Sequence, residues 1–172
     1  GVDAKHAAKR GIIVTNTPDV LNDEVADTTI ALLINTVRRL YQAESYLRDG
    51  KWVKEGPFAL SPFSLRGRKV GLFGMGRIGQ EIAKRLEPFK VEIGYHTRSK
   101  RDELSYTYYG SLKEMAQGVD TLICIVPGTP ETHKAINAEI FKALGPQGVF
   151  INVGRGSSVD EDALLAALKD GT

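Results

Sequence analysis

The fold of this chain is decided by the stretch Lys69-Val70-Gly71-Leu72-Phe73-Gly74-Met75-Gly76-Arg77-Ile78-Gly79-Gln80. An apolar strand pattern leads directly into the spacing G-x-G-x-x-G and then into a helical pattern that continues to about Leu86. Gly74 permits a tight turn, Gly76 leaves room for a pyrophosphate, and Gly79 lets the helix pack closely on the strand. The positive end of that helix would face the phosphates. The stretch therefore predicts a dinucleotide site, although three glycines in such a turn can also serve packing alone.

Strand and helix patterns alternate after this turn. Strands are predicted at 70–73, 91–96, 106–109, 121–126 and 149–153, and helices at 77–86, 111–118, 137–145 and 161–169. The continuous apolar run at 121–126 is typical of a central parallel strand that is covered on both faces. The alternation predicts an α/β fold, a Rossmann-type doubly wound parallel sheet that binds ligands at the carboxyl ends of its strands.

The patterns before the glycine turn are less regular. A short helix is predicted at 4–9 and a buried strand at 12–15. Helical spacing then runs from Asn22, a good N-cap, to a stop at Gly50. A helix of this length exceeds the average for globular proteins, so we expect something other than its own domain to cover part of it.

The segment 51–68 has no clean period, and its aromatic residues permit two interpretations. Side chains such as Trp52 and Phe63 either fill the core of their own domain or form a dimerisation arm. We expect one dinucleotide-binding domain over residues 1–172, in which 1–68 supply a strand, the long helix and the arm, and 69–172 supply the sheet core.

Composition limits the classes of partner. The 172 residues include 23 basic and 21 acidic side chains, for a net charge of +2, which is too small to favour nucleic acid or a membrane surface. A single cysteine, Cys124, excludes an internal disulfide and suits a buried thiol in a reducing compartment. No apolar run is long enough to span a bilayer, and no signal-peptide pattern is present, so a cytoplasmic protein is expected. Because the first residue is Gly1 rather than Met, we expect a piece of a longer chain.

The end of the second predicted strand distinguishes between nucleotides. An NAD site usually has an acidic residue there, whereas this sequence has Thr97-Arg98-Ser99-Lys100. Arg98 can bind a 2′-phosphate through its fork, Ser99 can donate a hydroxyl hydrogen, and Lys100 adds a positive charge. The segment therefore favours NADP over NAD, and the alternative is a solvated basic loop.

Two further loops follow predicted strands. Residues 127–132 come after the fourth strand, at the point where the strand order reverses, and can line the dinucleotide cleft or simply form a Pro/Gly turn. Arg155 stands between two glycines after the fifth strand, where it can bind a carboxylate or polarise a carbonyl, or form a surface ion pair. The three histidines, His6, His96 and His133, are best interpreted as structural or exposed residues.

Five short motifs, in this order, resemble the D-isomer-specific 2-hydroxyacid dehydrogenases. They are Gly1-Val2-Asp3, Gly11-Ile12-Ile13-Val14-Thr15-Asn16, Val25-Ala26-Asp27, Gly74-Met75-Gly76-Arg77-Ile78-Gly79 and Asn152-Val153-Gly154-Arg155-Gly156. Within that family the sequence is most similar to glyoxylate/hydroxypyruvate reductases and plant hydroxyphenylpyruvate reductases, through 97–100 and 106–110. Those relatives generally prefer NADPH, in agreement with the charge argument.

The resemblance assigns roles to residues of this sequence. It implies that Arg155 is the catalytic arginine, which binds the carboxylate and carbonyl of the substrate. The cofactor-binding residues that we predict are Gly74, Gly76, Arg77, Ile78, Gly79, Thr97, Arg98, Ser99, Lys100, Val126, Pro127, Gly128, Thr132, Val153 and Gly154. No metal is implied.

The resemblance also implies groups that lie beyond Thr172. The general acid of the family is a downstream histidine paired with a glutamate, and an aspartate after the next strand contacts the nicotinamide end. The family's substrate domain comes from segments on both sides of the nucleotide domain. We therefore expect a fragment that lacks the substrate domain and the last strand or strands, and that is inactive by itself.

The predicted function is that of a parent enzyme. It would reduce a small 2-oxo acid to the D-2-hydroxy acid with NADPH, or alternatively NADH, as the hydride donor, and it would form a homodimer through the long helix and the arm. One alternative is an NAD(P)-sensing module of the corepressor type. Another is an unrelated Rossmann domain in which Arg155 is an ordinary surface residue.

Overall fold

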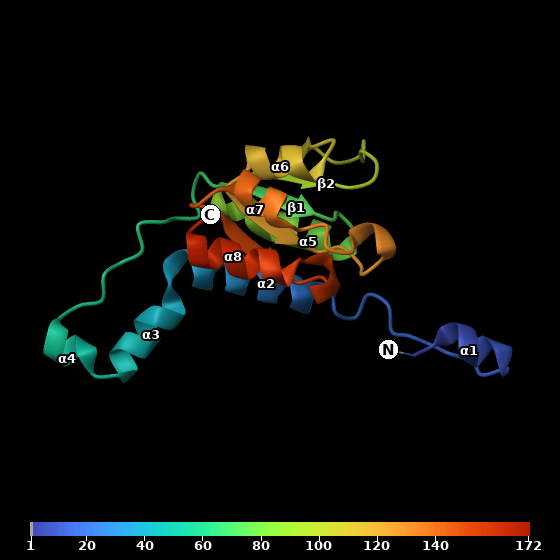
Figure 1. Ribbon diagram of the computed structural model, residues 1–172, viewed down its shortest axis with the longest axis horizontal. Helices are drawn as coiled ribbons and strands as arrows, with labels where there is room; N and C mark the ends of the chain where they lie inside the picture. Colours follow the sequence, from blue (N-terminus) through green and yellow to red (C-terminus); the bar gives the residue numbers. More distant parts are fainter. Residues whose placement is uncertain (1) are drawn as a thin grey trace.

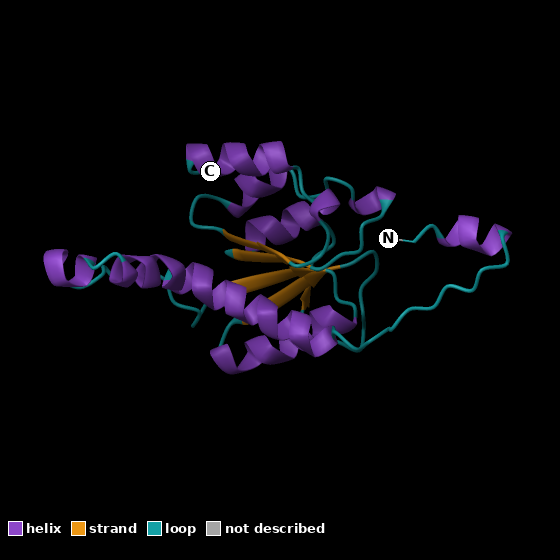
Figure 2. Cartoon of the chain, turned by 90° about the horizontal axis from the view of Figure 1, so that it is seen from below, coloured by secondary structure: helices purple, strands orange, loops and turns teal. Residues whose placement is uncertain are grey.

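A parallel sheet lies between two layers of helices in the computed structural model, which describes residues 2–172 (Figures 1 and 2). The strands are β1 (Lys69–Phe73), β2 (Glu92–His96), β3 (Thr107–Tyr108), β4 (Thr121–Cys124) and β5 (Val149–Asn152). Their order in the sheet is β3-β2-β1-β4-β5, and every neighbouring pair is parallel. This arrangement confirms the predicted α/β doubly wound fold.

Helices cover both faces of the sheet. One layer contains α2 (Asn22–Arg38) and α5 (Arg77–Leu86), and the other contains α6 (Leu112–Gly118), α7 (Ala138–Leu144) and α8 (Glu161–Asp170). Short 3-10 turns are η1 (Glu87–Phe89), η2 (Pro130–Thr132) and η3 (Gly156–Ser158). Because each crossover between parallel strands passes over a face, both faces become buried.

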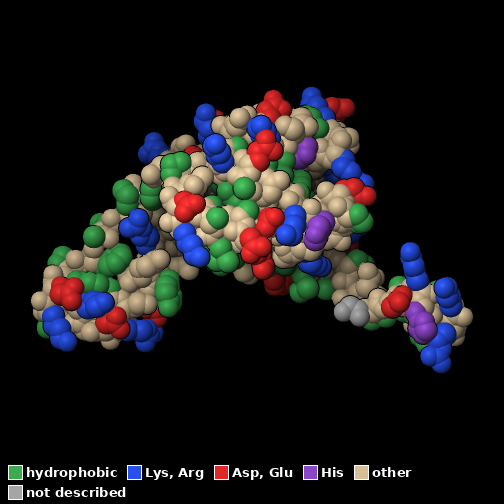
Figure 3. Space-filling model, in the orientation of Figure 1, with side chains coloured by type: hydrophobic (Ala, Val, Ile, Leu, Met, Phe, Trp, Pro, Cys, Tyr) green, Lys and Arg blue, Asp and Glu red, His purple; other side chains and the backbone are tan. Residues whose placement is uncertain are grey.

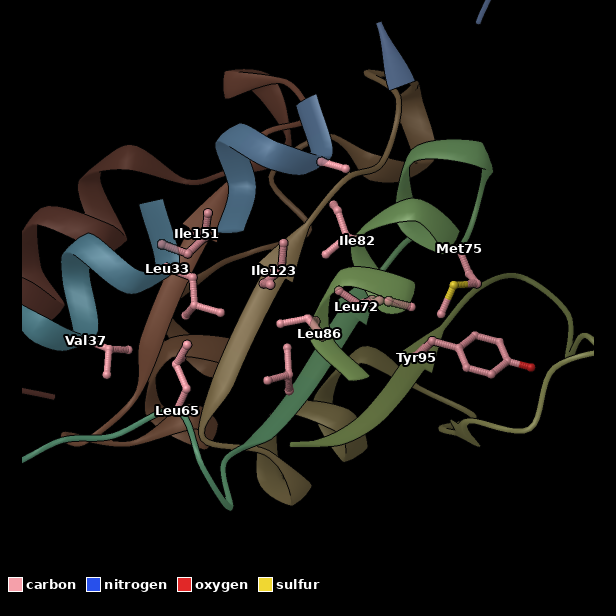
Figure 4. Close-up of a cluster of buried hydrophobic side chains, with 13 residues drawn as sticks. Leu33, Val37, Leu65, Leu72, Met75, Ile82, Leu86, Tyr95, Ile123 and Ile151 are labelled. Carbon is pink, nitrogen blue, oxygen red and sulfur yellow. The ribbon is translucent and has the colours of Figure 1, made fainter. Parts of the chain in front are cut away.

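Alternate residues of the strands fill two separate cores. Leu72 of β1 packs in the core beneath α2 and α5 (Figure 4), whereas its neighbour Phe73 packs in the core beneath α6 and α7. Cys124 is fully buried in the second core, and this burial raises the pKa of its thiol to about 11. The prediction of a buried thiol is confirmed.

The predicted strand at 12–15 is wrong. After α1 (Ala4–Lys9) the chain runs without regular structure as far as α2, and it lies away from the sheet (Figure 1). Ile12, Ile13 and Val14 are 53, 89 and 44% exposed. An apolar run forms a strand only where another strand pairs with its backbone, and the sheet described here does not reach this segment.

The predicted continuous helix from Asn22 to Gly50 is broken at Arg39. Arg39 has a φ of 54°, in the left-handed region, and α3 (Leu40–Arg48) starts after it. The Asn35 side chain accepts a hydrogen bond from the backbone N–H of Tyr41 at 2.9 Å. An amide oxygen thus replaces a helical carbonyl, which is how asparagine competes with helix continuation.

Asn22 was predicted to be the N-cap of α2, but it is the first residue of that helix. Leu21 precedes the helix and makes no side-chain capping bond. The Asn22 amide instead donates to Asp19 Oδ1 at 3.3 Å, so its side chain shapes the loop before the helix.

The two ends of the arm have different environments, and only the core interpretation is tested by them. Phe63 packs on the core beneath α2, and the Arg68 guanidinium lies 5.9 Å from the centre of its ring. Trp52, in α4 (Lys51–Glu55), is 52% exposed on the part of the chain that stands away from the body (Figures 1 and 3). The carboxyl end of the arm therefore belongs to the domain core, and its tip does not.

The remaining predicted elements are present with shifted ends. β2 begins at Glu92, β4 ends at Cys124 and β5 ends at Asn152, each short of the predicted range. The Ser111 hydroxyl accepts a hydrogen bond from the Glu114 N–H at 3.1 Å, as the predicted cap of α6 requires. None of the helices in residues 2–172 has the length and apolar character needed to cross a membrane.

Candidate functional site

The carboxyl ends of the strands meet at one edge of the sheet, and β1 lies at its centre. The Gly74 N–H donates to the His96 carbonyl at 3.1 Å, and the Ile125 N–H donates to the Phe73 carbonyl at 2.9 Å. The loops after β2 and β4 are therefore fastened on either side of the glycine turn. The chain reaches the β3 edge and then returns to β4, so the reversal of strand order falls at this turn, where open α/β sheets bind ligands.

The three glycines of the turn have different surroundings. Gly74 has a φ of 107°, and a Cβ atom on it would lie 2.9 Å from the Ile125 carbonyl oxygen. A Cβ atom on Gly79 would lie 2.5 Å from the Gly74 carbonyl oxygen. Beside Gly76 no described atom would lie within 4 Å of a Cβ atom. Packing thus accounts for Gly74 and Gly79, and it gives no reason for Gly76.

Gly76 opens onto a groove of about 570 Å³ at the amino end of α5. Its wall includes Arg77, Ile78, Gly79, Asp19 and Arg101. Gly76 is the N-cap of α5 and has no side chain to accept from the first N–H groups of the helix. Unpaired helix N–H groups facing an open groove fit the pyrophosphate of a dinucleotide. A larger groove of about 740 Å³ between α6 and α7 shares no residue with the strand ends.

Arg77 and Asp19 form an ion pair at 3.0 Å across this groove. Asp19 has a φ of 71°, a conformation that aspartate tolerates better than most residues. Asp19 could not be identified from the sequence, because its contact with Arg77 depends on how the loop before α2 approaches α5.

The loop after β2 carries the residues predicted to bind a 2′-phosphate. Thr97 is half-buried, and its hydroxyl donates to the Ser99 carbonyl at 2.7 Å. Arg98, Ser99 and Lys100 are exposed, and Lys100 lies 3.8 Å from an oxygen of Asp102. The loop therefore presents three polar side chains to the solvent beside the groove that Arg101 lines.

An acidic residue also approaches this loop, from a different strand end. The pKa of the Glu131 carboxyl is held below its usual range. The carboxyl accepts hydrogen bonds from the Thr129 side chain and from the backbone N–H of Glu131, and the charge of Arg98 adds to the effect. The NADP prediction relied on the absence of acidic residues from the end of the second strand. That absence holds for the β2 loop itself, but an acidic residue of the β4 loop lies near it. The position of Glu131 after β4 could have placed it at this edge of the sheet, but sequence gives no sign of its approach to Arg98.

Thr132 fixes the shape of the loop after β4. Its hydroxyl donates to the Pro127 carbonyl at 2.6 Å and accepts from the Thr129 N–H at 2.9 Å. Both bonds lie within the loop, which holds Pro127 and Gly128 exposed at the edge of the sheet. Thr132 therefore fixes the backbone of the loop on which Pro127 and Gly128 are exposed.

The loop after β5 is closed in a similar way. The Asn152 side chain accepts from the Gly154 N–H at 3.0 Å and donates to the Arg155 carbonyl at 3.2 Å. A Cβ atom on Gly154 would lie 2.7 Å from the Val126 carbonyl oxygen, and one on Gly128 would lie 3.3 Å from Arg155 Cγ. The loops after β4 and β5 are therefore in direct contact, and only glycine fits at Gly154.

Arg155 is held by its neighbours but exposes its charge. Its side-chain stem lies against Gly128, and its guanidinium donates to the Gly154 carbonyl at 3.0 Å. Within residues 2–172 no ion pair joins this guanidinium to a carboxylate. Its other donors remain available for an anionic ligand at the carboxyl edge of the sheet.

The histidines have separate environments. His96 bonds through Nδ1 to the Tyr109 carbonyl at 2.9 Å and stacks on Phe73 at 5.8 Å, His6 lies on α1, and His133 is exposed after η2. In the part of the chain that the structure describes, no group of three or more His, Cys, Asp or Glu side chains could hold a metal ion.

Comparison with known proteins identifies relatives over nearly the whole chain. A hydroxyphenylpyruvate reductase from Plectranthus scutellarioides is 47% identical over 170 residues, which cover 99% of this chain and 54% of the relative. A glyoxylate/hydroxypyruvate reductase from Arabidopsis thaliana is 42% identical with the same coverage. The chain thus spans about half the length of the relatives that it matches.

A solved structure gives a closer match. It is an NADPH-dependent glyoxylate/hydroxypyruvate reductase from Sinorhizobium meliloti in complex with NADP and malonate. The two are 65% identical with a TM-score of 0.94, over 99% of this chain and 54% of that one. Residues 30–172 also match the family described as D-isomer specific 2-hydroxyacid dehydrogenase, NAD binding domain. The chain belongs to this family, and the matched residues are its NAD-binding domain.

Proposed function

We propose that this chain is the nucleotide-binding domain of an NADPH-dependent reductase that converts a small 2-oxo acid, such as glyoxylate or hydroxypyruvate, into the D-2-hydroxy acid. The exposed guanidinium of Arg155 at the carboxyl edge of the sheet, in contact with the loop after β4, carries this proposal. The names of the relatives support it, since those reported above are all reductases of 2-oxo acids. None of them supports a corepressor role.

The proposed roles follow the geometry of the strand ends. Gly74 to Gly79 would hold the pyrophosphate, 97–100 the 2′-phosphate, and 126–128 with Val153 and Gly154 the rest of the cofactor, in a loop shaped by Thr132. Arg155 would bind the substrate carboxylate in bidentate fashion and polarise the 2-oxo group. The bound cofactor would supply the hydride, and the resemblance assigns the proton to a histidine that this sequence does not include.

A homodimer and a cytoplasmic location belong to the same proposal. Apolar side chains on α3 and the arm support the dimer, because they are exposed in one chain: Tyr41 69%, Leu47 60%, Val53 90% and Leu60 82%. A second copy would cover such a surface. The cytoplasmic location stays a prediction from the sequence.

The dimer can be tested by mass in solution. We expect twice the mass of one chain at micromolar concentration, and a shift to the single-chain mass on Val53→Asp, which places a charge at the tip of the arm. The matched control is Leu168→Asp, at an exposed apolar position on α8. A single-chain mass for the unmodified protein would refute the dimer.

The motif glycines should separate stability from cofactor binding. Gly76→Ala should leave the melting temperature unchanged, because its Cβ atom meets no described atom, while weakening NADPH and NADH equally. Gly79→Ala should lower the free energy of unfolding by about 1–3 kcal/mol, because its Cβ atom overlaps a backbone oxygen. Thermal melts and fluorescence titrations measure the two effects. Unchanged cofactor affinity in Gly76→Ala would contradict the pyrophosphate assignment.

Preference for NADPH should depend on Arg98. Arg98→Ala should weaken NADPH binding roughly tenfold or more, since it removes a charge-assisted hydrogen bond, and should leave NADH binding unchanged. Arg66→Ala is the control, because Arg66 is exposed before the amino end of β1, at the opposite edge of the sheet. Equal losses for NADPH and NADH would count against the assignment.

Turnover should depend on Arg155. In the reductase that contains this domain, Arg155→Lys should lower kcat/KM for glyoxylate about 10²–10³-fold, because lysine cannot reproduce the bidentate fork. The NADPH dissociation constant should stay the same, and Arg66→Ala again serves as the control. Undiminished turnover would identify Arg155 as an ordinary surface residue.

A further inference from the structure

A buried tyrosine is hydrogen-bonded to the backbone at one end of the loop that carries Arg98, Ser99 and Lys100. Tyr95 of β2 is fully buried, and its hydroxyl donates to the Arg101 carbonyl at 3.1 Å. The same hydroxyl accepts a hydrogen bond from the Arg101 backbone N–H at 2.9 Å. A single oxygen atom thus satisfies both backbone groups of the residue at which the loop ends.

A second tyrosine holds the other end of the loop. Tyr108 of β3 donates from its hydroxyl to the Thr97 carbonyl at 3.3 Å. The rings of Tyr108 and Tyr95 lie 5.4 Å apart at an angle of 55°, a favourable tilted arrangement. Neighbouring strands therefore fix both ends of the loop through one pair of packed rings.

Only the ends of the loop are tied to the tyrosines. Between them, the Thr97 hydroxyl bonds to the Ser99 carbonyl, which draws the backbone into a turn. The side chains of Arg98, Ser99 and Lys100 remain exposed. Figure 4 shows the Tyr95 hydroxyl directed away from the apolar cluster in which the ring sits.

A loop that is already ordered in the free protein loses little conformational entropy when the ligand binds. An anion held by several side chains gains most from such order, because each contact requires the others to be in place. NADH has no 2′-phosphate and therefore makes none of the contacts with that group, so the order of the loop does not strengthen its binding in this way. The buried hydroxyl cannot touch the ligand itself, so its effect must pass through the loop.

We propose that Tyr95, assisted by Tyr108, is a positioning residue that sets the preference for NADPH over NADH by fixing the 97–101 loop. This inference rests on the proposed function, in which that loop binds the 2′-phosphate. Tyrosine at position 95 is needed for its oxygen atom as well as its ring, because phenylalanine would fill the same core space.

The test compares three tyrosine variants by titrating NADPH and NADH separately. Tyr95→Phe should weaken NADPH binding about threefold to tenfold, the equivalent of one or two lost hydrogen bonds, and change NADH binding less than twofold. Tyr108→Phe should act in the same direction. Tyr106→Phe is the matched control, because its hydroxyl bonds to Glu87 Oε1 at 2.7 Å outside the loop, and it should leave the ratio unchanged.

The outcomes separate this inference from the proposed function. If Arg98→Ala lowers the ratio of NADPH to NADH affinity and both Tyr95→Phe and Tyr108→Phe leave it intact, the positioning role is refuted, and the phosphate site still stands. If Arg98→Ala also leaves the ratio intact, the phosphate site is refuted and the inference with it. Where a thermal melt shows that Tyr95→Phe does not fold, Tyr108→Phe decides. Equal weakening of both nucleotides would indicate a merely structural role and refute the proposal.

Discussion

Strand β1 is hydrogen-bonded to β2 on one side and to β4 on the other, and this central pairing positions the functional loops. Because all three strands are parallel, the segments that follow them leave the sheet side by side. The close approach of Gly79 to the Gly74 carbonyl then seats α5 directly on the end of β1. A side chain at Gly79 would therefore push the helix away from β1, and with it the groove in front of Gly76.

The loops around this centre share one structural device, in which a side-chain polar group closes each of them. The Thr132 hydroxyl bridges the loop after β4, the Asn152 amide bridges the loop after β5, and the Tyr95 hydroxyl closes the loop after β2. Each bond pairs with a backbone group that lies in a loop, outside the hydrogen-bond ladders of the sheet. Pro127, Arg98 and Arg155 are consequently exposed on ordered backbone.

Prediction from sequence succeeded where local pattern and packing agree. The glycine turn follows from its spacing. The alternating elements after Lys69 and the buried Cys124 follow from helical periodicity and from apolar runs, which the burial of both sheet faces enforces. The same reasoning failed at 12–15, where an apolar run has no strand to pair with. It failed again at Arg39, where a single side-chain bond from Asn35 interrupts an otherwise helical pattern.

Parts of the site lay beyond sequence reasoning because they depend on contacts between distant segments. Asp19 reaches Arg77 only because the loop before α2 crosses the amino end of α5. Glu131 influences Arg98 only because β1 separates β2 from β4 by a single strand. Neither contact has a signature in local spacing, whereas the position of Arg155 at a strand end could be predicted from its neighbouring glycines, and its role only from the resemblance.

These two carboxylates bear on how the cleft handles anions. Each lies beside an arginine that we propose faces a phosphate, so the cationic groups are partly neutralised in the chain as described. The exposed pair of Arg77 and Asp19 is weak, because water screens both charges, while the bond between a guanidinium and a phosphate is bidentate and charge-assisted. A phosphate can therefore displace the carboxylate from the arginine, or share the arginine with it, at a small cost in free energy. Asp19 holds the Arg77 side chain at the groove without closing it, which would suit the proposed site, because that site has to bind and release a cofactor.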